Sequence, residues 1–169
     1  RVLRAVLVAL AFAGPACSEE AGLVAHYASD EGEGTTAGDA SGHTNDGALH
    51  AAAFVVHGTG HALKFDGGKS WVDCGSGPSL DLREAVSLVL MMKITAIPPT
   101  GEPVVVGKGV NSGYGLTYYK DGVGPTGSRL YFYIGSEWTA TPVPLNTWLH
   151  VAATFDGGVN AALEEGIVN

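Results

Sequence analysis

The stretch that most constrains this chain is residues 62–82, where two short alternating runs flank a Gly-rich turn. The runs are residues 62–65 and 70–74, and Asp66 and Gly67 open the four residues between them. An Asp-Gly pair between alternating segments is a strong β-hairpin signal, because Gly adopts the positive φ that a tight turn demands. Pro78 lacks a backbone donor for a strand ladder, so a new segment should follow it. The stretch predicts a hairpin.

The rest of the chain repeats this pattern on a larger scale. Its 25 Gly and 8 Pro separate short runs that are rich in apolar and aromatic residues. Such punctuation favours an all-β sandwich or barrel. A length of 169 residues suits one domain with a sizeable core. The formal net charge of −8 argues against nucleic acid as a partner, because phosphate binding needs a basic face.

Residues 1–16 have the layout of a secretory signal peptide. Arg1 and Arg4 precede nine apolar residues at 5–13, and small residues follow at 14–16. The apolar run is much shorter than the roughly 20 residues that a membrane-spanning helix needs. A buried N-terminal helix is the alternative interpretation, but the Gly-Pro pair at 14–15 would end it. We therefore expect export, with no membrane-spanning segment in the mature chain and a short linker at 17–21.

The two cysteines leave several interpretations open. Cys17 follows small residues, as in a bacterial lipoprotein processing site, although Gly14 stands where that motif usually has Leu. Cys74 is expected to be a small, half-buried strand residue. A disulfide between Cys17 and Cys74 is an alternative in an exported protein, and spacing alone does not decide it. The chain has no Cys/His cluster at zinc spacing.

A long polar loop at residues 30–46 is rich in carboxylate and amide groups. Asp39, Asn45 and Asp46 lie there among Gly, Ser and Thr. Carboxylate and carbonyl oxygens are the ligands that Ca²⁺ prefers, but the spacing does not match an EF-hand loop. A solvated acidic loop and a calcium site both remain as interpretations of this stretch.

A series of short motifs occurs in the order found in a known family. The first are Gly-Leu-Val-Ala-His-Tyr at 22–27, Asp-Glu-Gly-Glu-Gly-Thr-Thr at 30–36 and Asp-Ala-Ser-Gly-His-Thr-Asn-Asp-Gly at 39–47. Leu-Lys-Phe-Asp-Gly at 63–67 and the run from Leu145 to Gly157 continue it. The series resembles laminin-G-like, concanavalin A-like jelly-roll modules over residues 22–157. The resemblance implies an antiparallel β-sandwich with jelly-roll topology.

The resemblance ends at residue 157. In this family another strand, an Asn-Gly hairpin and a closing strand follow, whereas residues 158–169 carry no such signal. The Ala-Ala-Leu-Glu-Glu piece at 161–165 suits a short helix. We therefore expect a module that is incomplete at its C-terminus, followed by an anomalous tail. An incomplete sandwich would expose a strand edge, which is an aggregation hazard.

The chemistry on offer favours binding over catalysis. The chain has neither the Glu-x-Asp-x-x-Glu string of some concanavalin A-like glycosidases nor a Gly-x-Ser-x-Gly nucleophile elbow. No catalytic residue is therefore predicted. The resemblance implies an extracellular module that binds a glycan or a protein, that is often calcium-dependent and that often belongs to a larger multidomain protein. The alternatives are a protein-adhesion or structural module and an accessory domain of a secreted glycoside hydrolase.

Candidate binding residues follow from these expectations. Exposed aromatic rings stack on sugar rings while polar neighbours bind the hydroxyls. The aromatic candidates are Trp71, Tyr118, Tyr119, Tyr133 and Trp138. Trp138 is expected to be the most exposed of them, because it follows Gly-Ser-Glu at 135–137, whereas Trp148 is expected in the core. By position in the resembled module, Asp39, Asn45 and Asp46 are the metal candidates.

Overall fold

The computed structural model describes residues 5–8, 22–96, 103–109, 113–120, 128–158 and 161–167, and these residues form an all-β structure. The strands are β1 (Ala5–Val8), β2 (Thr36–Ala37), β3 (Gly47–His50), β4 (Ala53–His57), β5 (Gly60–Lys64), β6 (Trp71–Asp73), β7 (Val86–Ile94), β8 (Val104–Lys108), β9 (Tyr114–Lys120), β10 (Ser128–Ile134), β11 (Glu137–Pro142), β12 (Leu149–Phe155) and β13 (Ala161–Ile167). A 3-10 turn, η1 (Pro78–Leu80), precedes β7. No described segment forms a helix long and apolar enough to cross a membrane.

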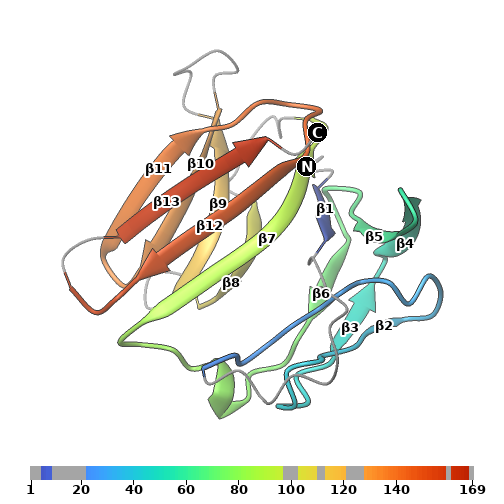
Figure 1. Cartoon of the computed structure of the whole chain (residues 1–169), viewed down its shortest axis with the longest axis horizontal. Coiled ribbons are helices and arrows are strands. Elements are labelled where there is room, and N and C mark those ends of the chain that lie inside the picture. Colours follow the sequence, from blue (N-terminus) through green and yellow to red (C-terminus); the bar gives the residue numbers. More distant parts are fainter. Residues whose placement is uncertain are drawn as a thin grey trace.

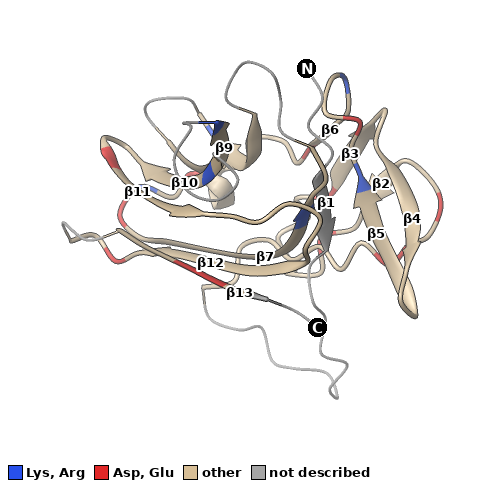
Figure 2. Cartoon of the chain, turned by 90° about the horizontal axis from the view of Figure 1, so that it is seen from above, with Lys and Arg blue, Asp and Glu red and all other residues tan. Residues whose placement is uncertain are grey.

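The described strands form three antiparallel sheets. A six-stranded sheet has the order β13-β12-β7-β1-β5-β4, a four-stranded sheet the order β11-β10-β9-β8, and a small sheet the order β2-β3-β6. Figures 1 and 2 show β9, β10 and β11 layered over β7, β12 and β13. The architecture is therefore sandwich-like, as the composition predicted.

The core lies between these two layers and follows from strand alternation. In β10, Leu130, Phe132 and Ile134 are buried while the residues between them are only half-buried. Successive side chains of a strand point to opposite faces, so one face of β10 packs inward. Facing it, Met92 on β7 and Val151 on β12 are both 0% exposed. The apolar run at 85–94 is rich in β-branched residues, which predicts a core strand with packing methionines, and it forms β7 with Met91 and Met92 buried.

The predicted hairpin at residues 62–74 is wrong. Strand β5 pairs with β4 and β1, whereas β6 pairs with β3 in a different sheet. The predicted turn at Asp66 is nevertheless present. Asp66 Oδ1 accepts hydrogen bonds from the backbone N–H of Gly68 and Ser70 at 2.8 and 3.0 Å. The bonds from Gly68 and its neighbours lower the pKa of the Asp66 carboxyl. Asp66 therefore orders a loop that passes from one sheet to another.

Two further expectations are corrected by the structure. The weak alternation of residues 22–27 predicts a first strand, but these residues form none. Residues 161–167 form β13 instead of a helix, and they pair with β12 from Leu149 opposite Ile167 to Phe155 opposite Ala161. The long edge of β12 supplies a complete ladder of partners, and this tertiary pairing outweighs helix propensity.

The N-terminal segment enters the six-stranded sheet. Ala5–Val8 pairs with β5 and β7, so the described part of this segment is a strand and not the buried helix of the alternative interpretation. The remainder of the predicted signal peptide and linker lies outside the described residues, as does Cys17. Cys74 is half-buried and forms no disulfide with a described residue, and burial raises the pKa of its thiol.

Glu165 occupies an unusual position on edge strand β13. It is the Cα partner of Val151, which is 0% exposed, so Glu165 shares the core-facing side of the sheet. Partial desolvation raises the pKa of its carboxyl. Native proteins place inward-pointing charges on edge strands to block edge-to-edge pairing. Glu165 is exposed on this edge strand, and its charge disfavours edge-to-edge pairing there.

The raised pKa of Glu165 makes a prediction about stability. Because the folded state favours the protonated Glu165 carboxyl, the charged carboxylate lowers the free energy of unfolding at pH values above the folded pKa. In acid the carboxyl is protonated in both states and this destabilisation disappears. Glu165→Gln is expected to raise the midpoint of thermal unfolding at pH 7 by about 1–2 °C, since solvent screening keeps the effect near 0.5 kcal/mol. At pH 3.5 the two proteins should unfold together. A lower midpoint for the variant at pH 7 in circular dichroism melts would contradict the partial desolvation of the Glu165 carboxyl.

Candidate functional site

Four aromatic residues lie on the outer side of the four-stranded sheet, and we call this set the aromatic face. Tyr131 and Tyr133 alternate with the core residues of β10, so they point away from the core. Trp138 on β11 is the Cα partner of Tyr133 and therefore shares its side. Tyr119 on β9 lies opposite Arg129, which is also on the outer side. The aromatic face thus spans three adjacent strands.

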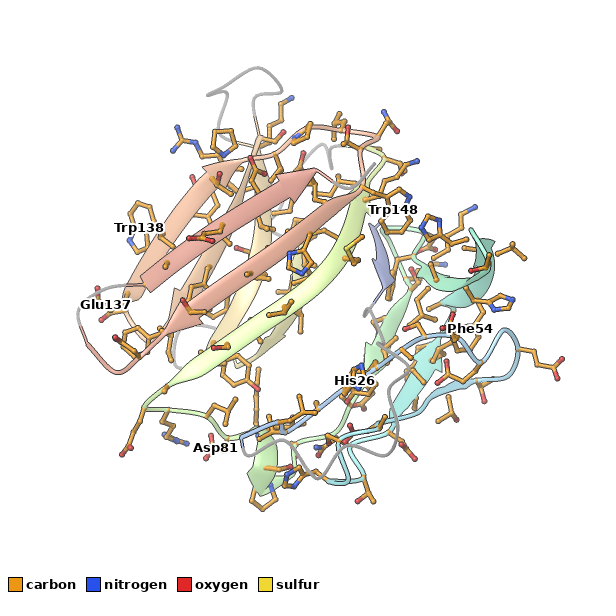
Figure 3. All side chains as sticks on the ribbon, in the orientation of Figure 1. His26, Phe54, Asp81, Glu137, Trp138 and Trp148 are labelled. Atoms are coloured by element: carbon orange, nitrogen blue, oxygen red, sulfur yellow. The ribbon has the colours of Figure 1, made fainter. Side chains whose placement is uncertain are left out.

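Three of these rings are in contact across the strands. The ring centroids of Tyr119 and Tyr131 are 6.0 Å apart with an interplanar angle of 82°. Those of Tyr131 and Trp138 are 5.8 Å apart at 41°. Trp138 is 66% exposed, and Figure 3 shows it projecting from the start of β11 beside Glu137. The indole therefore offers an accessible ring at the end of a row of supporting aromatics.

The side chain of Tyr133 runs along the outer surface of the sheet toward the neighbouring strands. Its hydroxyl donates a hydrogen bond to the carbonyl of Gly109 at 3.2 Å. A Cβ atom added at Gly115 would lie 2.8 Å from that hydroxyl, and one at Gly107 would lie 3.1 Å from it. The glycines thus leave room for the Tyr133 side chain to cross β9. Burial raises the pKa of Tyr133, and the residue flanks the exposed indole without presenting a free ring.

Tyr118 is removed from the candidate set by its position. It is 0% exposed and lies on the core side of β9 with Tyr114 and Leu116, so its ring offers no face to a ligand. Burial raises the pKa of its hydroxyl. The neighbouring Tyr119 is 38% exposed and takes the outer position. Alternation with Tyr114 and Leu116 was the signal that could have separated the two tyrosines. By the same alternation, Tyr131 and Tyr133 of β10 lie on the same side of the sheet. Sequence reasoning did not include Tyr131 among the candidates.

The other two tryptophans lie away from the aromatic face. Trp71, on β6 of the small sheet, is 51% exposed and stacks on His50 at 4.0 Å with an interplanar angle of 10°. Figure 1 shows β6 and β11 on opposite sides of the molecule, so Trp71 and Trp138 do not form one site. Trp148 was expected in the core but is half-buried, and its ring contacts that of His57 at 4.2 Å.

Asp39 is the centre of the polar loop, where it accepts hydrogen bonds through both carboxylate oxygens. Oδ1 accepts from the backbone N–H of His26 and of Ser41, each at 2.9 Å. Oδ2 accepts from the Ser41 hydroxyl and the backbone N–H of Asn45, also at 2.9 Å. Partial burial acts to raise the pKa of Asp39, but these hydrogen bonds outweigh it and lower that pKa to about 2. Asp39 therefore holds together segments that are up to 13 residues apart.

The other two predicted metal ligands also make hydrogen bonds within the protein. Asn45 donates through Nδ2 to the carbonyl of Val24 at 2.7 Å and accepts through Oδ1 from the Ser79 hydroxyl at 3.0 Å. Asp46 Oδ1 accepts from the backbone N–H of Asp39 at 2.8 Å. The three side chains therefore order the loop through bonds to the protein, and calcium binding by them stays a prediction. No group of three or more His, Cys, Asp or Glu side chains in the described residues could hold a metal ion.

Comparison of the chain with protein-family models, with curated proteins and with solved structures found no match. The geometry of the described residues is therefore the basis for assigning a function. The structure brings Trp138 and Tyr133 together on the aromatic face and joins Asp39, Asn45 and Asp46 in one loop. It places Trp71 on a separate sheet and Tyr118 in the core. The aromatic face is the candidate site.

Proposed function

We propose that this protein is an extracellular binding module that recognises carbohydrate through the aromatic face. The observation that carries the proposal is the exposed indole of Trp138 supported by Tyr131. Sugar rings present apolar C–H faces that stack on an aromatic ring, while hydroxyl groups of the protein bind the hydroxyls around the ring. Tyr119, which is 38% exposed, would supply such a hydroxyl on the same face. The proposed role is recognition without catalysis.

The wider setting of this proposal follows from the sequence. The ordered motifs at 22–157 support a laminin-G-like jelly roll, and the layout of residues 1–16 supports a secreted or cell-surface location. The acidic net charge of −8 argues against a nucleic-acid partner. Modules of the resembled kind are often parts of larger proteins, and we propose the same here. Calcium dependence through Asp39, Asn45 and Asp46 is implied by the resemblance and stays a prediction.

The proposal is tested by replacing the exposed indole. Wild-type protein is first screened against an array of neutral and acidic glycans, and the best ligand is titrated by calorimetry. Trp138→Ala is expected to weaken binding about tenfold or more, since loss of a stacking ring removes at least about 1.4 kcal/mol of binding free energy. The unfolding midpoint should change little, because the indole is 66% exposed.

Trp71→Ala is the matched control for this experiment. It removes another indole that is 51% exposed, but on the small sheet away from the aromatic face. This variant should bind the glycan like the wild type. The proposal fails if no glycan binds the wild type, or if the two variants lose affinity equally.

A further inference from the structure

Strand β1 holds the middle of the six-stranded sheet together. Ala5–Val8 pairs antiparallel with β7 on one side and with β5 on the other, as Figure 1 shows. In the sheet order, β1 is the strand that joins the β4-β5 pair to the β7-β12-β13 unit. These residues also fall inside the predicted signal peptide at 1–16, which export would remove. The mature chain would then have an open groove between β5 and β7.

The geometry of that groove matches one added strand. Neighbouring strands lie about 4.8 Å apart, so β5 and β7 without β1 are separated by roughly twice that distance and cannot hydrogen-bond to each other. Each would present unpaired N–H and C=O groups along the facing edge. Addition of an extended peptide to such an edge is a common mode of protein recognition, in which backbone bonds supply affinity and side-chain positions supply specificity.

The side chains beside the groove specify what the added strand should carry. The position of Leu7 lies between Leu63 and Met92, which are 2% and 0% exposed, so it belongs to the core side. The position of Val6 is on the other side, between Lys64 on β5 and Lys93 on β7. Lys64 is exposed and Lys93 half-buried. Figure 2 shows basic positions on both strands that flank β1.

The two lysines lack a carboxylate partner in the described structure. The ion pair found among the described side chains joins Arg83 to Asp81, and it involves neither lysine. A carboxylate at the position of Val6 would be directly cross-strand from both lysines. Opposite charges in directly opposed positions stabilise a sheet, whereas valine carries no charge to pair with them.

We propose that the groove between β5 and β7 is an acceptor site for an extended segment of a partner polypeptide. The segment carries an apolar residue at the position of Leu7 and a carboxylate at the position of Val6. This interaction is separate from glycan binding at the aromatic face, and it rests on removal of residues 1–16 during export. The bound segment rejoins the two parts of the six-stranded sheet.

The test begins with the full chain expressed in a secreting host. Intact mass of the exported protein identifies its first residue. The protein is then titrated by fluorescence anisotropy with labelled peptides of residues 3–10, carrying either the parent sequence or Val6→Glu. We expect an exported chain without residues 1–16 that binds the Val6→Glu peptide about tenfold more tightly than the parent peptide, because two opposite-charge pairs form.

Exchanging the charges supplies the decisive control. In the Lys64→Glu/Lys93→Glu protein, the preference should reverse toward a Val6→Lys peptide. If the exported chain folds only with peptide present, the gain of β-sheet circular dichroism signal is measured with each peptide instead. The Val6→Glu peptide should then induce the signal at a lower concentration than the parent peptide. In the unexported full chain, where β1 fills the groove, Val6→Glu should raise the unfolding midpoint by about 2–4 °C.

Several outcomes would overturn the proposal. One is an exported protein that retains Ala5–Val8. Equal affinity for the parent and Val6→Glu peptides is another, and so is a preference unaffected by the charge exchange. Self-association of the exported chain that blocks peptide binding would assign the groove to a second copy instead.

Discussion

Phe132→Ala is expected to lower the free energy of unfolding by about 3–5 kcal/mol. Phe132 is 0% exposed and lies in the core between the two layers, with Leu116 on β9 as its Cα partner. Truncation removes the transfer free energy of the ring and leaves a cavity that rigid strands fill poorly. Total stability of a domain is only about 5–15 kcal/mol, so the variant should be close to unfolding at 37 °C.

The measurement is urea denaturation followed by far-ultraviolet circular dichroism. Tyr131→Ala is the control on the same strand, because it removes a ring of similar size from the outer side of β10. Its loss of stability should be well below that of Phe132→Ala. Equal losses would contradict the assignment of inner and outer faces to β10, and with it the aromatic face.

Asp39→Asn is expected to lower the free energy of unfolding by about 1–2 kcal/mol at pH 7. The carboxylate accepts four hydrogen bonds at 2.9 Å, three of them from backbone N–H groups, and an amide has one acceptor oxygen in place of two. The depression of the pKa from 3.8 to about 2, at roughly 1.4 kcal/mol per unit, corresponds to about 2.5 kcal/mol before screening. Solvent screening reduces the effect, because Asp39 is only half-buried.

The pH dependence of the wild type follows from the same pKa. A depressed folded pKa means that the stabilisation is fully present above the unfolded value near 3.8 and is lost as the pH falls toward 2. Asp39→Asn should therefore be less stable than the wild type at pH 7 and should lose less stability between pH 5 and pH 2. Asp73→Asn is the control, because Asp73 accepts one local bond from Gly75. Parallel pH profiles for wild type and Asp39→Asn would contradict the role of Asp39.

Several features were predictable from the sequence because their causes are local. Alternation and Gly/Pro punctuation predicted an all-β chain. The runs at 47–50, 85–94 and 129–134, each of which predicts a strand by its pattern, form β3, β7 and β10. The turn at Asp66 was also predictable, since its hydrogen bonds join residues at most four apart. The exposure of Trp138 followed from its polar, Gly-containing approach.

Other features depend on partners far away in the chain. The strands on either side of Asp66, β5 and β6, do not pair with each other, because other strands compete for their edges. Strand β5 pairs with β4, and β6 pairs with β3. Tyr118 and Tyr119 are adjacent and chemically alike, and the face of the sheet that meets the core assigns one to the interior and the other to solvent. The helical tendency of residues 161–165 yields to the free edge of β12.

The sequence by itself therefore determined the class of structure, the position of its turns and the exposure of one indole. These depend on backbone preferences and on side-chain periodicity within a few residues. Only the tertiary structure decided the pairing of strands, the composition of the aromatic face and the use of Asp39 as a hydrogen-bond centre. The physical reason is that each of these requires two segments, distant in the chain, to meet in one register, and that choice is made by the packing of the whole core.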